Sequence, residues 1–180
     1  MNSGKERICV DMDEVMADAV GEHLRRYNAE FKEQLSIDQM QGKWMWDVVD
    51  PSRHSVLEGY MRSADFFRVL GVMRDSQRVM RALQDKYEVF IATAAMEVPT
   101  SFTAKYLWLE EHFPFIAPSH IVFCGDKSIL NADYLIDDNP RQLRRFPGKG
   151  ILYDSHHNVH ESAFPRVKGW LDVEKMFLKS

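Results

Sequence analysis

Five short apolar runs alternate along the chain with stretches of helical periodicity, and this alternation constrains the fold more than any other feature. The runs expected as strands are Arg7–Val10, Glu88–Ala92, His120–Cys124, Tyr134–Ile136 and Gly150–Tyr153. Each is brief and bounded by polar or turn residues, as strands covered on both faces are. The pattern predicts an α/β fold with a parallel sheet and helices on both of its faces.

Apolar and aromatic residues recur at helical spacing between these runs. The stripes are Val20, Leu24, Tyr27 and Phe31; Val79, Met80, Leu83 and Tyr87, behind a candidate helix cap at Ser76; and Phe102, Tyr106, Leu109 and Phe113. Residues at such spacings share one face of an α-helix, so most of these side chains are expected in the core.

The stretch from about residue 17 to residue 70 departs from the alternation. It carries helical signals, Trp44, Trp46 and an Asp50-Pro51 break, but no convincing strand. A connection of ~50 residues is too long for an ordinary crossover. We therefore expect residues 17–70 to form a small helical cap over the carboxyl ends of the strands, inserted into a core of residues 1–16 and 71–180.

Composition narrows the classes of partner. The chain has 180 residues, a net charge of −4 and 28% charged residues. This balance gives no electrostatic reason to expect a nucleic-acid polymer or an anionic membrane. A small phosphorylated molecule remains compatible with it, because a bound metal can outweigh the global charge. Oligomeric state is open, with a homodimer as one option.

Location and redox state follow from what the sequence lacks. The first residues, MNSGKERICVDMD, resemble no signal peptide, and no run approaches the ~20 apolar residues of a membrane helix. Cys9 and Cys124 lie in strand-like runs, where cysteine behaves as a small hydrophobe. Reduced thiols and a cytoplasmic location are expected.

Carboxylates follow two of the expected strands. Asp11 and Asp13 come after Arg7–Val10, and Asp137 and Asp138 come after Tyr134–Ile136. Ligands of open parallel sheets bind at the carboxyl ends of strands, and alternate side chains of an extended chain point the same way. Several carboxylates in one place are costly unless a hard cation neutralises them. The pattern predicts a Mg²⁺ site.

Two other strand ends supply groups that suit a phosphate. Thr93 offers a hydroxyl and Lys127 an ammonium group, each just after an apolar run. Each piece alone is weak evidence, since an Asp-x-Asp after a strand is most often a solvated turn. The order Asp-x-Asp, Thr, Lys, Asp-Asp, each after its own strand, is far more specific.

These four motifs resemble those of the haloacid dehalogenase (HAD) superfamily. Over almost the whole chain the sequence is most similar to the 5'(3')-deoxyribonucleotidases, through DMDEVMAD, IATAA, GDKSILNADYLIDDNP and the HHNVH loop before a helix with Trp170. The resemblance implies a HAD-like fold. It also implies a magnesium-dependent phosphomonoesterase that hydrolyses (deoxy)ribonucleoside monophosphates through an aspartyl-phosphate on Asp11.

The resemblance also implies roles for individual residues. Asp11 is the nucleophile and Asp13 the general acid and base. The metal is held by Asp11, the backbone carbonyl of Asp13 and Asp138, with Asp137 in support. The expected phosphate ligands are Thr93, Lys127 and Lys105, the last in the AKYLW segment.

Four positions depart from the family pattern. Glu14 stands where the superfamily usually has glycine, Ala94 where the nucleotidases have a phosphate-contacting serine, and Gly125 where they have an arginine. Lys43 replaces an aromatic residue beside Trp44. None removes the expected nucleophile, acid or metal ligands, so they bear on nucleotide specificity.

Aromatic residues of the expected cap admit two interpretations. Trp44, Phe66 and Phe67 fall where nucleotidase caps stack the base, which implies that they contact the substrate. Buried core packing is the alternative, and the commoner role of such residues.

Three histidines and three arginines are expected to be ordinary solvent-exposed residues and not functional sites. His156, His157 and His160 lack a cysteine or carboxylate at ligand spacing, so we expect solvated loop residues instead of a transition-metal site. Arg141, Arg144 and Arg145 are expected on a solvated helix face, without the interleaved aromatic residues of a nucleic-acid surface.

Other functions remain as alternatives. A HAD phosphatase of another small metabolite, such as a sugar phosphate, would share the catalytic residues and differ in the cap. A receiver-like signalling domain also uses an acidic pair, Thr and Lys, but lacks an acid two residues after the phosphorylated Asp and a large insertion. A calcium-binding EF-hand starting at Asp11 is excluded, because it would need an oxygen ligand at Val15 and glycine at Met16, and the sequence has neither.

Overall fold

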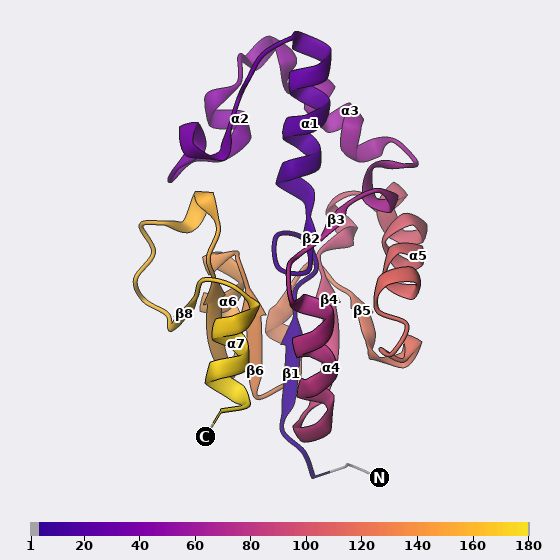
Figure 1. The fold of residues 1–180 in the computed structure, drawn as a ribbon, viewed down its shortest axis with the longest axis vertical. Coiled ribbons are helices and arrows are strands. Elements are labelled where there is room, and N and C mark those ends of the chain that lie inside the picture. Colours follow the sequence, from indigo (N-terminus) through magenta and orange to yellow (C-terminus); the bar gives the residue numbers. More distant parts are fainter. Residues whose placement is uncertain (1–3, 180) are drawn as a thin grey trace.

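The computed structural model describes residues 4–179, and its centre is a parallel sheet of six strands (Figure 1). The strand order is β5-β4-β1-β6-β7-β8, and every pair is parallel. The strands are β1 Arg7–Val10, β4 Glu88–Thr93, β5 Ile121–Phe123, β6 Tyr134–Asp137, β7 Lys149–Tyr153 and β8 Arg166–Val167. The five predicted strands are confirmed with their ends within one residue. The two-residue strand β8 was not predicted, since it is too short for a periodic signal.

Helices cover both faces of the sheet, as predicted. Ile8 and Val10 of β1 belong to a large hydrophobic cluster shared with three helices, and Cys9 belongs to a second cluster on the opposite face. The helices are α4 Ser76–Lys86, α5 Phe102–His112 and α7 Trp170–Phe177 on the first face and α6 Pro140–Arg145 on the second. Cys9 and Cys124 are both buried and free.

The remaining helices lie beyond the carboxyl ends of the strands, at the top of Figure 1. They are α1 Ala19–Phe31, α2 Met45–Val48 and α3 His54–Arg62. They enclose a hydrophobic cluster of their own, made of Leu24, Tyr27, Met40, Met45, Val49 and Leu57. This separate cluster supports the division into a core and a cap, which stays a prediction.

A two-stranded antiparallel ribbon stands at the base of these helices. Ala17 of β2 (Ala17–Asp18) pairs with Val72 of β3 (Gly71–Val72). The chain thus leaves the core and returns to it through neighbouring strands, close to the expected cap limits of residues 17 and 70. The sequence did not predict this ribbon, because two residues show no alternation.

Two local predictions were tested by the described residues. Ser76 is not the cap of α4: Asp75 precedes the helix with a φ of 65°, and Ser76 begins it and donates to the carbonyl of Met73 at 2.6 Å. Arg141, Arg144 and Arg145 are exposed on α6, as expected. Within residues 4–179, the helices are too short or too polar to cross a membrane.

A buried hydrogen bond joins the last helix to the loop after β1. Nε1 of Trp170 donates to the carbonyl of Val15 at 2.7 Å, and both residues are almost fully buried. Val15 lies two residues after Asp13, so this bond helps to fix the loop that carries the acidic pair.

We expect Trp170→Phe to lower the free energy of unfolding by about 1–3 kcal/mol, because it leaves the Val15 carbonyl buried without a donor. Urea denaturation measures the change. Leu171→Ala, at a neighbouring exposed position of the same helix, is the control and should change stability by less than about 0.5 kcal/mol. Equal losses in the two variants would contradict the role of the hydrogen bond.

Candidate active site

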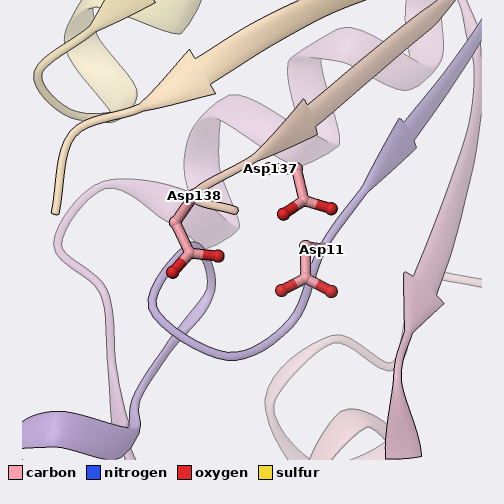
Figure 2. Close-up of side chains that lie close together, drawn as sticks. All are labelled: Asp11, Asp137 and Asp138. Carbon is pink, nitrogen blue, oxygen red and sulfur yellow. The ribbon is translucent and has the colours of Figure 1, made fainter. Parts of the chain in front are cut away.

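Three carboxylates converge at the carboxyl ends of two neighbouring strands. Asp11 follows β1, and Asp137 and Asp138 stand at the end of β6, which pairs with β1. One oxygen of each residue lies within 4.8 Å of the others, and Figure 2 shows the three side chains turned toward a common point. The structure thus brings together the carboxylates that the sequence assigned to a metal.

Lys127 supplies a buried positive charge to this cluster. It begins a 3-10 turn after β5, and its Nζ donates to Asp11 and, at 2.6 Å, to Oδ2 of Asp137. Burial alone would lower the pKa of Lys127, but the charges of the two carboxylates and the hydrogen bonds raise it above its ordinary value. The ammonium group therefore stays charged and offsets part of the repulsion between the carboxylates.

Lys105 of α5 connects the other two predicted residues. Its Nζ donates to Oδ2 of Asp13 at 2.5 Å and to Oγ1 of Thr93 at 3.0 Å. The other carboxylate oxygen of Asp13, Oδ1, is buried and has no hydrogen-bond partner among the described residues. A phosphoryl group bound here would have its oxygen atoms near the Lys105 ammonium group, the Thr93 hydroxyl and the Asp13 carboxylate.

The charge balance of the site fits a divalent cation. Four carboxylates, of Asp11, Asp13, Asp137 and Asp138, face the two ammonium groups of Lys105 and Lys127. Burial, followed by the neighbouring acidic charges, raises the pKa of Asp11 to about 7 and that of Asp138 well above its usual range, against the opposing effect of Lys127. With all four carboxylates ionised the excess is two negative charges, and oxygen-only donors with such an excess suit Mg²⁺.

Glu14 has a structural role that explains one departure from the family pattern. Its φ is 60°, a left-handed conformation that favours glycine, the usual residue there. The Glu14 carboxylate accepts a hydrogen bond from the backbone N–H of Val20 at 2.8 Å, in the first turn of α1. Burial raises the pKa of Glu14 to about 8. The residue thus joins the loop of the acidic pair to the first helix of the expected cap.

A cavity of about 310 Å³ lies above the carboxylates. Its floor includes Asp11, Asp13 and Lys127, and its lining also includes residues of the helical insertion. Those residues are Ala19, Val20, His23, Trp44, Met45, Trp46 and Met61. The cavity is thus charged at one end and largely apolar and aromatic at the other, which suits a phosphate ester of an organic group.

The structure separates the three aromatic residues that the sequence proposed as substrate contacts. Trp44 lines the cavity and is 47% exposed, whereas Phe66 and Phe67 are buried in the core cluster and are not among the lining residues. The Phe67 ring lies under Lys105, with Nζ 4.6 Å from its centre. The two phenylalanines are therefore core residues, as the alternative interpretation expected. Phe67 contributes to the site only by packing against Lys105.

The expectation of solvated loop histidines is wrong for two of the three. His156 and the His157 side chain are buried, and only His160 is exposed. The His157 ring stacks on Trp44 at 3.9 Å, and its Nε2 lies 3.2 Å from the carbonyl of Asp138. Burial lowers the pKa of both His156 and His157, so they are neutral at pH 7. Sequence spacing could not reveal a contact with a distant tryptophan.

Sequence reasoning missed several residues of the site. Gln142 of α6 accepts from the backbone N–H of Lys127 at 3.2 Å and donates to the carbonyl of Gly125 at 3.0 Å, which holds the turn before Lys127. His23 and Met61 line the cavity from α1 and α3. The only sequence signal for His23 was a polar residue beside the apolar stripe that contains Leu24.

Comparisons with known proteins find nucleotidases that match almost the whole chain. The family model described as "5' nucleotidase, deoxy (Pyrimidine), cytosolic type C protein" matches residues 5–180. The 5'(3')-deoxyribonucleotidase of Bacillus subtilis is 37% identical over 177 residues, which cover 97% of this chain and 99% of that protein. A Staphylococcus epidermidis protein, provisionally named as the same enzyme, is 45% identical over 173 residues, 96% of each chain.

Solved structures with a similar fold are HAD hydrolases. The HAD-like hydrolase SP0104 of Streptococcus pneumoniae gives a TM-score of 0.64 at 10% identity, with 96% of this chain and 98% of that chain covered. A HAD family hydrolase of Deinococcus radiodurans, solved with phosphate and sodium, gives 0.63 at 14% identity, with coverage of 96% and 94%. These matches confirm the predicted HAD-like fold.

The extent of the family match and the identity to the Bacillus relative decide the assignment. The chain belongs to the family of 5' nucleotidase, deoxy (pyrimidine), cytosolic type C proteins, and it is a hydrolase of the nucleotidase and phosphatase class.

Proposed function

We propose that the protein is a magnesium-dependent phosphomonoesterase that hydrolyses (deoxy)ribonucleoside monophosphates through an aspartyl-phosphate on Asp11. The observation that carries this proposal is the convergence of the acidic cluster and Lys127 on one end of a cavity whose other end is aromatic. Lys105 adds a second ammonium group from outside the cavity lining, through its contact with Asp13. The names of the relatives, which are deoxyribonucleotidases, support a nucleotide as the substrate.

The covalent step is assigned to Asp11. Its carboxylate attacks phosphorus, the ester bond breaks, and the phosphoryl group is carried by the enzyme until water releases it. Lys127 donates a hydrogen bond to one Asp11 oxygen, which orients the carboxylate so that the other oxygen is available for attack. Lys127 also offsets the charge of the transferring group.

Proton transfer is assigned to Asp13. Lys105 anchors its Oδ2, whereas Oδ1 has no partner among residues 4–179, and Asp13 itself lines the cavity. Asp13 gives a proton to the leaving alkoxide and then takes one from the attacking water. In this structure Lys105 donates a hydrogen bond to Thr93. We propose that these two residues bind phosphoryl oxygens together with Lys127.

The proposed metal ligands are Asp11, the backbone carbonyl of Asp13 and Asp138, with Asp137 in support. Mg²⁺ bound there supplies positive charge that stabilises the charged phosphoryl group during transfer. A nucleotide is the proposed small-molecule partner, and Trp44 the proposed aromatic contact for it. A homodimer and a cytoplasmic location stay predictions.

A substrate panel with Mg²⁺ tests the activity. We expect phosphate release from deoxynucleoside monophosphates and a loss of at least roughly a thousandfold in Asp11→Asn, since the nucleophile is removed. Circular dichroism checks that the variant keeps its fold. Asp85→Asn, at an exposed position of α4, is the matched control and should keep full activity.

Two results would count against the proposal. An Asp11→Asn protein as active as the wild type would remove the aspartyl-phosphate mechanism. Turnover of sugar phosphates with inert deoxynucleoside monophosphates would replace the substrate class by the alternative metabolite phosphatase.

The raised pKa values predict how pH affects stability without metal. Asp11 has an ordinary pKa of 3.8, so the unfolded chain loses this proton near pH 4, whereas the folded protein holds it up to about pH 7. The stabilisation by this proton is complete below pH 4 and is lost as pH rises through 7, and Asp138 acts in the same direction. Glu14 acts in the same direction, whereas the lowered pKa values of His23, His156 and His157 oppose this trend below about pH 6.5. With a chelator present, the melting temperature should therefore fall between about pH 6.5 and pH 8.

Mg²⁺ should reverse this trend, because it binds ionised carboxylates and competes with protons. We expect Mg²⁺ at about a hundred times its Kd to raise the melting temperature by roughly 5–10 °C at pH 8, and by less at pH 5. Differential scanning fluorimetry measures both, with Asp138→Asn expected to lose most of the effect. An equal or larger rise at pH 5 would argue against carboxylate ligation.

A further inference from the structure

Unsatisfied polar atoms gather at the cavity. Within residues 4–179, five buried side-chain atoms have no hydrogen-bond partner: Asp13 Oδ1, His23 Nδ1, Arg68 Nη1, Ser101 Oγ and His156 Nε2. Three of these residues, Asp13, His23 and His156, line the same cavity. Buried polar atoms of proteins are nearly always hydrogen-bonded, so this concentration of exceptions shows that the described residues leave the polar side chains around the cavity incompletely paired.

His23 is held in place by aromatic neighbours that cannot satisfy it. Its ring lies 4.6 Å from Phe66, 5.5 Å from Trp46 and 6.3 Å from Tyr60, between ring centres. The residue is only 5% exposed, and its Nδ1 is buried without a hydrogen-bond partner among residues 4–179. Burial lowers its pKa to about 4, so the imidazole is neutral and carries one N–H and one acceptor nitrogen.

The position of His23 along α1 sets which part of a substrate it meets. Ala19 and Val20, in the first turn, line the cavity near Asp13. His23 lies one turn farther along a helix that runs away from the sheet, about 6 Å beyond Ala19 at the usual rise per residue (Figure 1). A phosphoryl group at the carboxylates therefore leaves His23 beside the organic part of the ester.

We propose that His23 is a specificity-determining residue that donates a hydrogen bond from Nε2 to an acceptor of the nucleoside moiety. Nδ1 is the nitrogen shielded from solvent, and a shielded acceptor is tolerated better than a shielded N–H, which places the proton on Nε2. His156 is less suited to this role, because it also lines a second cavity of about 330 Å³, whose lining includes Ile37 and Gln41. The inference rests on the proposed nucleotidase activity and adds a residue to it.

Two substrates separate recognition from chemistry. One is the 2'-deoxynucleoside 5'-monophosphate that the wild type hydrolyses fastest, and the other is phenyl phosphate, whose leaving group has no acceptor beyond the ester oxygen. We expect His23→Leu to lower kcat/KM for the nucleotide roughly tenfold, the size of one lost hydrogen bond, mainly through KM. Phenyl phosphate hydrolysis should change less than about twofold, since it uses only the reacting groups.

Further variants distinguish a hydrogen bond from packing. His23→Gln places an amide N–H near the position of Nε2 and should restore most of the nucleotide kcat/KM. His23→Asn reaches only the position of Nδ1 and should not. His54→Leu, the same substitution at a half-buried residue of α3 outside the cavity lining, is the matched control and should leave both substrates unaffected.

The inference is overturned by equal losses for the two substrates, which would indicate a packing role, or by an unchanged nucleotide kcat/KM in His23→Leu. It is also overturned if His23→Gln behaves as His23→Leu does. A wild-type protein that hydrolyses phenyl phosphate but no nucleotide gives a different result: the proposed substrate class fails before any variant is compared.

Discussion

Repulsion between buried carboxylates is the constraint on which the rest of this structure depends. Asp11 and Asp137 stand at the ends of adjacent strands with little access to water, and Lys127 places one ammonium group between them. Lys127 reaches them from the turn after β5, on the other side of β4 in the sheet. The ion pairs therefore hold three strand ends in register, and removal of one partner of such a buried pair typically costs about 3–5 kcal/mol. The same lysine that serves the phosphoryl group in the proposed mechanism also permits the acidic site to fold.

The helices above this site contact the core in two places, at the start of α1 and at the segment that precedes α2. At the base, Glu14 accepts from the N–H of Val20. Before α2, Trp44 stacks on His157 of the loop after β7, and the N–H of Gly42 donates to the carbonyl of His156 at 2.7 Å. Gly42 has a φ of 72°, and a Cβ there would lie 2.5 Å from Nε2 of His160, so this close approach requires glycine. These contacts enclose the cavity between the carboxylates and the aromatic residues.

The four departures from the family pattern affect different parts of the molecule. Glu14 accepts a hydrogen bond from the first turn of α1, and Ala94 lines the cavity, where a methyl group replaces a hydroxyl. Gly125 is exposed and offers its carbonyl to Gln142, and Lys43 is exposed beside Trp44. None of the four displaces a carboxylate of the site. Of these departures, those at Glu14 and Ala94 border the cavity and are placed to alter contacts with a bound phosphate ester.

The sequence by itself determined the five longer strands, the helices on both faces and the carboxylates that follow β1 and β6. It could do so because alternation and apolar runs are local properties, and because parallel strands all end at the same edge of a sheet. Tertiary structure alone decided which groups meet: Lys105 with Thr93 and Asp13, Trp44 with His157, and the core positions of Phe66 and Phe67. It also decided that His23 borders the cavity and that its Nδ1 has no hydrogen-bond partner within residues 4–179. Periodicity states which face of a helix is buried but not what lies opposite that face, since the opposite surface comes from residues distant in the chain.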